Sequence, residues 1–219
     1  MQEFNAAENY KAVCESIPEG VTLIAVSKTR SIDEIRLIAG LGQKDFGENK
    51  AQELCEKFDS IENVRWHFIG HLQTNKVKSV VGKAYLIHSV DSIHLADAIE
   101  KQAAKLGIKQ NVLVQVNVAG EIQKSGVPLQ DAEDLCDYIR TNCKHIDLKG
   151  LMQVAPDCEN KEDTREYFST LTKLLSKMKL DILSMGMSED YKIAIEEGSN
   201  MVRIGTAIFG PRDYSKQKG

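Results

Sequence analysis

The sequence predicts an α/β fold: a single TIM-like (β/α)8 barrel with an extra helix at its N-terminus. Short β-branched runs alternate with longer amphipathic stretches, and eight such pairs can be counted along the 219 residues. Alternation of this kind indicates parallel strands, because these need crossover connections that are usually helical. A doubly wound open sheet is the competing architecture, but the turn after the first strand, residues 27–31, lacks the expected glycine fingerprint.

The order of elements follows from these runs. A leading amphipathic helix is expected at residues 3–16. The expected strands are Leu23–Val26, Lys44–Phe46, Val64–Ile69, Ala84–His88, Asn111–Val118, Leu148–Gln153, Ile182–Ser184 and Met201–Ile204. The helices expected between them are Ile32–Leu41, Lys50–Phe58, Asn75–Val81, Ser92–Leu106, Leu129–Thr141, Lys161–Met178 and Ser188–Glu197. No proline-, glycine- or serine-rich linker interrupts this order, so we expect one domain over residues 1–219, with a polar tail at about residues 214–219.

Composition argues against several partners. The chain has 28 Lys+Arg against 32 Asp+Glu, a formal net charge of -4, and no basic block that would neutralise a row of phosphates. Nucleic acid is therefore not an expected partner. The sequence has no heptad pattern and no long apolar face, which predicts a monomer.

The sequence also predicts a cytoplasmic protein. Its first residues are polar and acidic, where a secretory signal needs a basic start and an apolar run. No window approaches the roughly 20 apolar residues that span a bilayer, so no membrane partner is expected. The five cysteines are odd in number and include no C-x-x-C pair, which fits neither a disulfide framework nor a zinc site.

The functional site should lie at the C-terminal ends of the strands, where the loops after strands seven and eight often bind phosphate. Ser188 follows strand seven in a position to cap the next helix, and Gly205-Thr206 follows strand eight. Backbone N–H groups at such loops and helix starts can bind phosphate. Taken singly, these residues would be read as turn and cap residues, but two such loops at these two strands favour a phosphate site.

Lys28 closes the first expected strand and therefore lies at the same mouth of the barrel. A lysine at a strand end is ordinarily a solvated side chain. Beside a phosphate pocket, however, its amine can condense with an aldehyde, as a cofactor held by a Schiff base requires. The two features together predict a lysine that holds an aldehyde cofactor.

Three further residues have two interpretations each. Arg203 lies within an apolar strand, where its guanidinium needs a partner: either a buried carboxylate or a ligand such as the ring nitrogen of a pyridine cofactor. His67 either faces the barrel mouth or is a hydrogen-bonded core histidine. Lys124, in a polar loop after the fifth strand, is either a second cofactor-contacting amine or solvated, and we favour the solvated interpretation.

Five segments, in order along the chain, match the motifs of a known family. They are AVSKT at residues 25–29, FGENKAQE at 46–53, WHFIGHLQTNK at 66–76, LSMGMS at 183–188 and VRIGTAIFG at 202–210. On these motifs the chain resembles the pyridoxal phosphate homeostasis proteins, the YggS or PROSC family. The block at residues 66–76 is the most specific of the five.

The resemblance implies the fold of the alanine racemase N-terminal domain, a fold-type III barrel with pyridoxal 5'-phosphate (PLP) on a lysine at the end of the first strand. It implies that Lys28 is the Schiff-base lysine and that Arg203 faces the pyridine nitrogen. The other implied pocket residues are Ser188, Gly205 and Thr206 at the phosphate, and Ser184, Asn49 and His67 along the walls.

Alanine racemase has a second, β-rich domain that supplies a catalytic tyrosine, whereas this sequence stops at Gly219, so we expect half of the acid/base machinery to be missing. The resemblance thus implies a protein of intracellular vitamin B6 (PLP) homeostasis without established catalysis. It would carry the cofactor as a reversible Schiff base, supply it to apo-enzymes and influence amino-acid and keto-acid balance. The alternative is a PLP-dependent amino-acid racemase or lyase of low activity that uses Lys28 as its base. A phosphosugar enzyme on the same barrel, with Lys28 only as a cation, also stays open.

Overall fold

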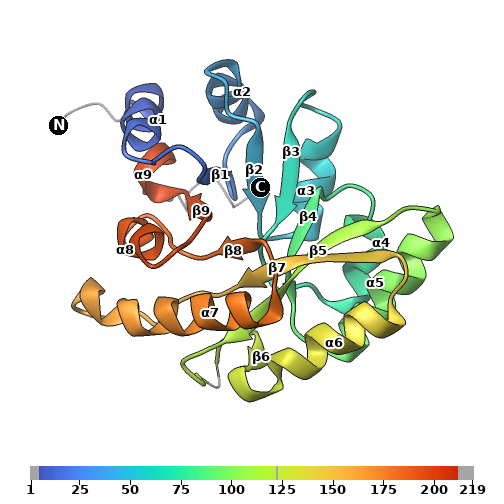
Figure 1. The fold of residues 1–219 in the computed structure, drawn as a ribbon. Helices are drawn as coiled ribbons and strands as arrows, with labels where there is room; N and C mark the ends of the chain where they lie inside the picture. Colours follow the sequence, from blue (N-terminus) through green and yellow to red (C-terminus); the bar gives the residue numbers. More distant parts are fainter. Residues whose placement is uncertain (1–4, 122, 212–219) are drawn as a thin grey trace.

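The computed structural model describes residues 5–121 and 123–211 and confirms the predicted barrel (Figure 1). Eight parallel strands pair in the order β1-β2-β3-β4-β5-β7-β8-β9, and β9 pairs with β1 to close the ring. The ring strands are β1 (Thr22–Val26), β2 (Asp45–Glu48), β3 (Arg65–Phe68), β4 (Leu86–Val90), β5 (Gln110–Asn117), β7 (Ile146–Met152), β8 (Ile182–Ser184) and β9 (Met201–Ile204). The two-residue strand β6 (Val127–Pro128), which was not predicted, pairs with the end of β5.

Helices surround the ring of strands (Figure 1). They are α1 (Ala6–Glu15), α2 (Ile32–Gly40), α3 (Ala51–Phe58), α4 (Val77–Val80), α5 (Ile93–Leu106), α6 (Ala132–Asn142), α7 (Arg165–Met178), α8 (Tyr191–Glu196) and α9 (Thr206–Phe209). Three of the predicted helices begin with a short 3-10 turn, at Thr74–Lys76, Leu129–Asp131 and Lys161–Thr164. The extra N-terminal helix is confirmed as α1, while residues 1–4 and the predicted polar tail lie outside the described residues.

One helix boundary was predicted wrongly. Ser188 was expected to cap a helix at Ser188–Glu197, but α8 begins only at Tyr191. The Asp190 carboxylate accepts the Met187 N–H at 2.6 Å, which closes a turn over residues 187–190 before the helix starts. Ser188 is thereby left in a loop, where its side chain can face the barrel mouth. The short helix α9 was not predicted.

Local sequence explains several helix starts and ends. Asn5 accepts two N–H groups at the start of α1, and Ser31 and Glu34 form a reciprocal capping box at the start of α2. Ser92 caps α5, and Gly107 ends that helix with φ of 66°, a left-handed conformation that glycine adopts without strain. These caps fix the lengths of the helices that cover the barrel.

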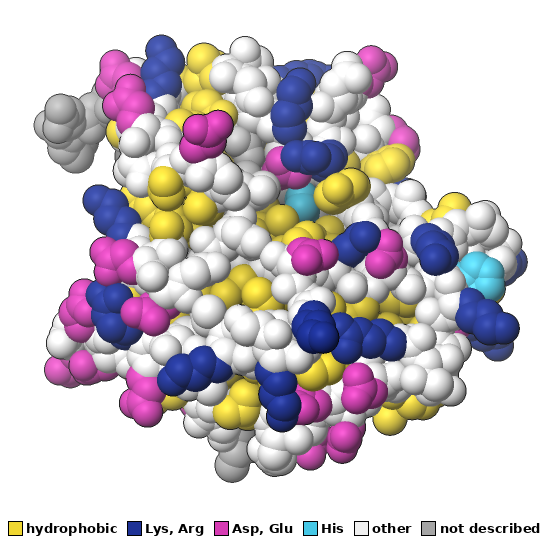
Figure 2. All heavy atoms as spheres, in the orientation of Figure 1, with side chains coloured by type: hydrophobic (Ala, Val, Ile, Leu, Met, Phe, Trp, Pro, Cys, Tyr) yellow, Lys and Arg dark blue, Asp and Glu magenta, His cyan; other side chains and the backbone are white. Residues whose placement is uncertain are grey.

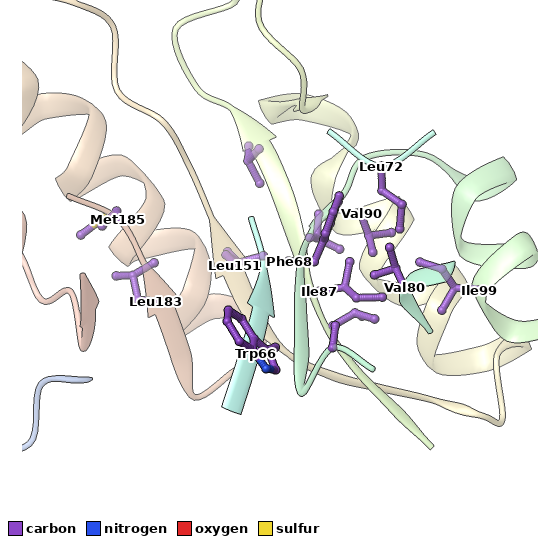
Figure 3. Close-up of a cluster of buried hydrophobic side chains, with 14 of the residues drawn as sticks. Trp66, Phe68, Leu72, Val80, Ile87, Val90, Ile99, Leu151, Leu183 and Met185 are labelled. Carbon is purple, nitrogen blue, oxygen red and sulfur yellow. The ribbon is translucent and has the colours of Figure 1, made fainter. Parts of the chain in front are cut away.

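Two apolar layers stabilise the barrel. Inside the ring, residues from five strands pack together: Ile24, Leu86, Leu113, Met152 and Met201. Outside it, strand residues meet the covering helices, and Figure 3 shows such a cluster, in which Phe68 of β3 and Ile87 of β4 face Val80 of α4 and Ile99 of α5. The interior is therefore filled at the level of these residues.

The two ends of the described chain meet on one side of the barrel. Helix α1 packs against α9, as the blue and red helices in Figure 1 show. The hydroxyl groups of Ser16, at the end of α1, and Tyr191, in α8, are 2.7 Å apart. The element that precedes β1 thus supports the elements that flank β9.

Basic and acidic side chains are interspersed on the face shown in Figure 2, and they form no continuous basic surface there. No helix in the part of the chain that the structure describes combines the length and the hydropathy that a membrane span requires.

Gly150 provides a test of the barrel packing. A methyl group at this position would collide with the carbonyl oxygen of Ile182, because β7 and β8 pair there. We expect Gly150→Ala to lower the free energy of unfolding in urea by about 2 kcal/mol or more, since backbone atoms cannot move aside.

Gly40→Ala is the matched control for this substitution. Gly40 ends α2, and an added Cβ meets no atom within 4 Å. We expect its free energy of unfolding to stay unchanged or to rise by up to about 1 kcal/mol. Equal unfolding midpoints for the two variants would contradict the packing argument.

Candidate functional site

A pocket of about 460 Å³ opens at the C-terminal ends of the barrel strands. Six of the residues selected from the sequence line it: Lys28, Asn49, Ser188, Arg203, Gly205 and Thr206. They come from the ends of β1, β2, β8 and β9, which lie next to one another because the ring closes between β9 and β1. Segments far apart in the sequence therefore face one cavity.

Two of the selected residues lie deeper in the barrel than the pocket lining. Ser184 is fully buried, and its Oγ accepts a hydrogen bond from Nη1 of Arg203 at 2.7 Å. His67 is also fully buried, with its Nε2 2.8 Å from Asp45 Oδ1 and its Nδ1 3.0 Å from His88 Nε2. Of the two interpretations of His67, the structure agrees with the hydrogen-bonded core histidine.

The loops after β8 and β9 approach each other at the expected phosphate side. Ser188 Oγ accepts the backbone N–H of Ala207 at 3.2 Å, which ties the two loops together. A Cβ at Gly205 would lie 3.3 Å from Val26, so the start of the β9 loop packs closely on β1. In α9 the Ala207 N–H is taken by Ser188, and the Ile208 and Phe209 N–H groups donate to the carbonyl oxygen of Gly205, so among the described residues the donors left at the start of this helix are the N–H groups of Gly205 and Thr206. This arrangement offers donors to an anion in the pocket.

The turn that carries Lys28 is held from outside the barrel by helix α3. Lys57 Nζ donates to the carbonyl oxygen of Ser27 at 2.9 Å, and Glu53 Oε2 accepts the N–H of Thr29 at 2.7 Å. Thr29 has φ of 65°, a left-handed conformation that is unusual for a β-branched residue. The residues on both sides of Lys28 are thus fixed in a strained turn, which directs Lys28 to the mouth.

Beneath this turn lies a buried charge cluster in which one ammonium group faces two carboxylates. Lys57 Nζ is 2.9 Å from Glu48 Oε1 and 3.2 Å from Glu53 Oε2. Burial raises the pKa of Glu48 to about 7, and its contacts with Lys57 and Ser27 only partly oppose this. Glu53 is less buried, and its bonds to Thr29 and Lys57 outweigh the effect of burial and lower its pKa.

Arg203 is 4% exposed and lies where the pocket meets the barrel interior. Besides the bond to Ser184, its Nη2 donates to the carbonyl oxygen of Gln153 at 2.8 Å. Within the described residues it forms no salt bridge, so the alternative of a buried ion pair does not account for it. Burial lowers its pKa to about 10, and the nearby Asp190 carboxylate opposes this shift. The side chain nevertheless remains a cation at neutral pH.

Lys124 lines the pocket and is not simply solvated, in contrast to the interpretation that the sequence favours. Its Nζ pairs with Glu121 at 2.6 Å and donates to the carbonyl oxygen of Ala155 at 3.0 Å. It therefore links the loop after β5 to the loop after β7 at the rim.

Several pocket residues escaped the sequence analysis. Val154–Asp157 follow β7 and line the mouth, although the same strand-end rule could have selected them. Lys57, which supports the Lys28 turn from outside the pocket lining, carried a weaker signal, because it lies three residues after Leu54 on the buried side of α3. A lysine at such a position indicates a buried ion pair.

Comparisons with known proteins agree with this geometry. The family described as "Alanine racemase, N-terminal domain" matches residues 4–213. The Pyridoxal phosphate homeostasis protein of Aquifex aeolicus (strain VF5) is 43% identical over 218 residues, which cover 94% of this chain and 95% of that protein. The chain belongs to the pyridoxal phosphate homeostasis protein family. The family member from Escherichia coli (strain K12) is 38% identical over 214 residues, with 93% and 91% of the two chains covered.

Solved structures show the same relationship. PipY of Synechococcus elongatus PCC7942, solved with PLP bound, superposes with a TM-score of 0.86 at 30% identity and covers 94% of this chain and 100% of that one. Alanine racemase of Clostridium difficile 630 superposes with a TM-score of 0.80 at 17% identity, where this chain covers 60% of the racemase. The racemase thus shares the barrel fold with this member of the homeostasis family.

The buried cluster below Lys28 predicts a pH dependence of stability. An acid whose pKa is higher in the folded than in the unfolded state contributes stability that is present below pH 4.5 and is lost as the pH rises to about 7. Glu48→Gln removes this titration. The free energy of unfolding of the variant, relative to wild type, should therefore rise between pH 5 and pH 7.5, by an amount on the order of 3 kcal/mol.

Glu53→Gln provides the opposite case within the same cluster. The pKa of Glu53 is lowered in the folded state, so Glu53 stabilises the protein above its unfolded pKa, and its replacement should be more harmful at pH 7 than at pH 4. Chemical unfolding across this pH range measures both variants. A Glu48→Gln difference that does not change with pH would contradict the raised pKa of Glu48.

Proposed function

We propose that this chain binds pyridoxal 5'-phosphate in the mouth pocket, holds it on Lys28 as a reversible Schiff base and supplies it to apo-enzymes. The observation that carries the proposal is that Lys28, Arg203 and the loops at Ser188 and Gly205-Thr206 line one pocket. Membership in the homeostasis family and the PLP bound to PipY support the choice of cofactor. Such a cofactor would supply an aldehyde for condensation and a pyridine ring as an electron sink.

The pocket residues fit this group. A cavity of about 460 Å³ is in the range of small-molecule sites. Five basic residues line it against three acidic ones, which suits a phosphate dianion: Lys28, Arg30, Lys124, Lys161 and Arg203 against Asp157, Glu189 and Asp190. Asn49 lines the pocket, and its buried Oδ1 makes no hydrogen bond within the described part of the chain. A bound hydroxyl group would satisfy that oxygen.

Each residue has a defined role in this proposal. The Lys28 amine condenses with the aldehyde and releases one water, and hydrolysis reverses this step. Ser188, Gly205 and Thr206 bind the phosphate through hydroxyl and backbone N–H groups. Arg203 would face the pyridine nitrogen and, as a cation that only donates hydrogen bonds, would favour an unprotonated nitrogen.

The described lining of the pocket favours holding the cofactor over turnover. It includes no tyrosine, histidine or cysteine, and its carboxylates already have partners: Asp157 and Glu189 pair with Lys161, and Asp190 accepts the N–H of Met187. Two-base racemisation needs a second acid or base on the other face of the cofactor. A carrier, in contrast, needs only reversible attachment and an open mouth. We therefore propose storage and delivery of PLP, with an influence on amino-acid and keto-acid balance through the enzymes that receive it.

Covalent attachment is tested by trapping. Wild-type protein incubated with PLP should absorb as an imine, and borohydride should fix one adduct on the peptide that contains Lys28. In Lys28→Ala this adduct should disappear, whereas Lys161→Ala, another lysine of the pocket, should retain it. Mass mapping of the reduced protein measures the outcome. An adduct that persists elsewhere in Lys28→Ala at the wild-type yield would overturn the assignment.

Delivery is tested with a PLP-dependent apo-enzyme as acceptor. Loaded wild-type protein should reactivate the acceptor when a phosphatase destroys any PLP that becomes free, because transfer then occurs without release to solution. Lys28→Ala treated in the same way should give less than about a tenth of that reactivation, since its non-covalent PLP dissociates within the assay. Equal reactivation by both proteins would contradict a role for the Schiff base. Turnover of amino acids by wild type, lost in Lys28→Ala, would favour an enzyme instead.

A further inference from the structure

A continuous chain of buried polar side chains crosses the barrel interior below the pocket. It begins at Asp45, at the amino end of β2, and ends at Arg203, in the mouth pocket. The successive contacts are Asp45 Oδ1 to His67 Nε2 at 2.8 Å, His67 Nδ1 to His88 Nε2 at 3.0 Å, His88 Nδ1 to Ser184 Oγ at 3.0 Å and Ser184 Oγ to Arg203 Nη1 at 2.7 Å. Five strands thus contribute one side chain each to this chain of contacts: β2, β3, β4, β8 and β9.

Both ends of this chain impose the same direction on its hydrogen bonds. A guanidinium only donates, so Ser184 must accept from Arg203, and the hydroxyl hydrogen is left for His88 Nδ1. At the other end a carboxylate only accepts, so His67 must carry its hydrogen on Nε2. If both histidines are neutral, His88 then donates from Nε2 to His67 Nδ1. Every donor meets an acceptor in this single arrangement.

The surroundings keep the chain in this state. His67, His88 and Ser184 are completely buried, and burial lowers the pKa of both histidines, that of His88 well below its usual value. Burial by itself would raise the pKa of Asp45, but its hydrogen bonds with His67 and Arg65 lower it. Arg65, whose side chain is 49% exposed, binds Asp45 through Nε at 2.8 Å and Nη2 at 2.6 Å. The carboxylate is thus an ionised anchor near the surface.

We propose that Asp45, His67, His88 and Ser184 form a relay of positioning residues that orients the Ser184 hydroxyl and thereby fixes Arg203 at the floor of the mouth pocket. Among the described residues, Ser184 and Gln153 are the two groups that accept hydrogen bonds from the Arg203 guanidinium. A hydroxyl that rotated its hydrogen toward the guanidinium would lose the first of them. The relay is inferred from contacts within the protein, and only its effect on PLP binding rests on the proposed function.

Two replacements of His88 separate the relay from simple packing. Asparagine can place its oxygen near the position of Nδ1 and keep an acceptor for Ser184, whereas glutamine can reach His67 but offers Ser184 no acceptor. We expect His88→Gln to raise the dissociation constant for PLP about tenfold, the value of one lost hydrogen bond, and His88→Asn to stay within about threefold of wild type. Packing alone predicts the reverse order, because asparagine leaves the larger cavity.

Two further variants complete this experiment. Ser184→Ala removes the contact to Arg203 and should match His88→Gln, and combining the two substitutions should add nothing. Ser89→Ala is the control, because Ser89 is an equally buried serine next to His88 with no hydrogen bond from its Oγ among the described residues. Its affinity for PLP should equal that of wild type. A His88→Asn variant that binds PLP more weakly than His88→Gln would overturn the relay.

The relay can also be observed without any cofactor. Long-range ¹H–¹⁵N NMR spectra of the cofactor-free protein should show His67 and His88 as neutral Nε2–H tautomers at pH 7, with the two assigned by their loss in His67 and His88 variants. An Nδ1–H tautomer or an imidazolium at either position would contradict the proposal. If wild-type protein does not bind PLP, the proposed function fails, whereas the tautomers still decide whether the relay exists.

Discussion

The common direction of the eight barrel strands is the constraint on which the rest of this structure depends. Because all of them run parallel and the ring closes between β9 and β1, their carboxyl ends meet at one mouth. Lys28, at one end of the sequence, and Arg203, near the other, therefore line the same pocket. An open sheet in which β1 and β9 did not pair would not bring the ends of these two strands together. The pairing of β1 with β9 thus decides whether a site exists.

Two polar systems serve this pocket from different sides of the barrel wall. Outside the ring, Glu48, Glu53 and Lys57 hold the strained turn on which Lys28 is carried. Inside it, Arg203 is held by the hydrogen bonds that it donates to the Ser184 hydroxyl and the Gln153 carbonyl oxygen. Both systems place charged groups in a low-dielectric interior, which is costly unless every group finds a partner. Because the large core cluster is apolar, the presence of these polar groups indicates that they provide position rather than stability.

This division fits the proposed role, in which the protein holds its cofactor reversibly. The proposed covalent contact is made by one lysine on a rigid turn, while the loops after β8 and β9, which are proposed to bind the phosphate, lie at the open mouth. A rigid attachment point keeps the cost of ordering low when the cofactor binds. An open mouth would leave the way free for the receiving enzyme that the proposal requires. The same barrel fold in alanine racemase shows that fold alone does not separate carriage from catalysis, and the side chains at the mouth have to do so.

The sequence by itself determined the fold class, the order of the elements and six residues that line the pocket, because the periodicity of apolar residues and the position of a residue at a strand end are local properties. It also contained the motifs that place the chain in its family. It did not determine the start of α8, since the Asp190 side chain, and not Ser188, closes the turn before that helix. Nor could it decide between the two interpretations of His67 or find Asp45 and His88. These residues come from different strands, and only the curvature and closure of the barrel bring them within hydrogen-bonding distance. Such contacts depend on tertiary structure, because no local pattern records which side chains meet across the interior of a closed sheet.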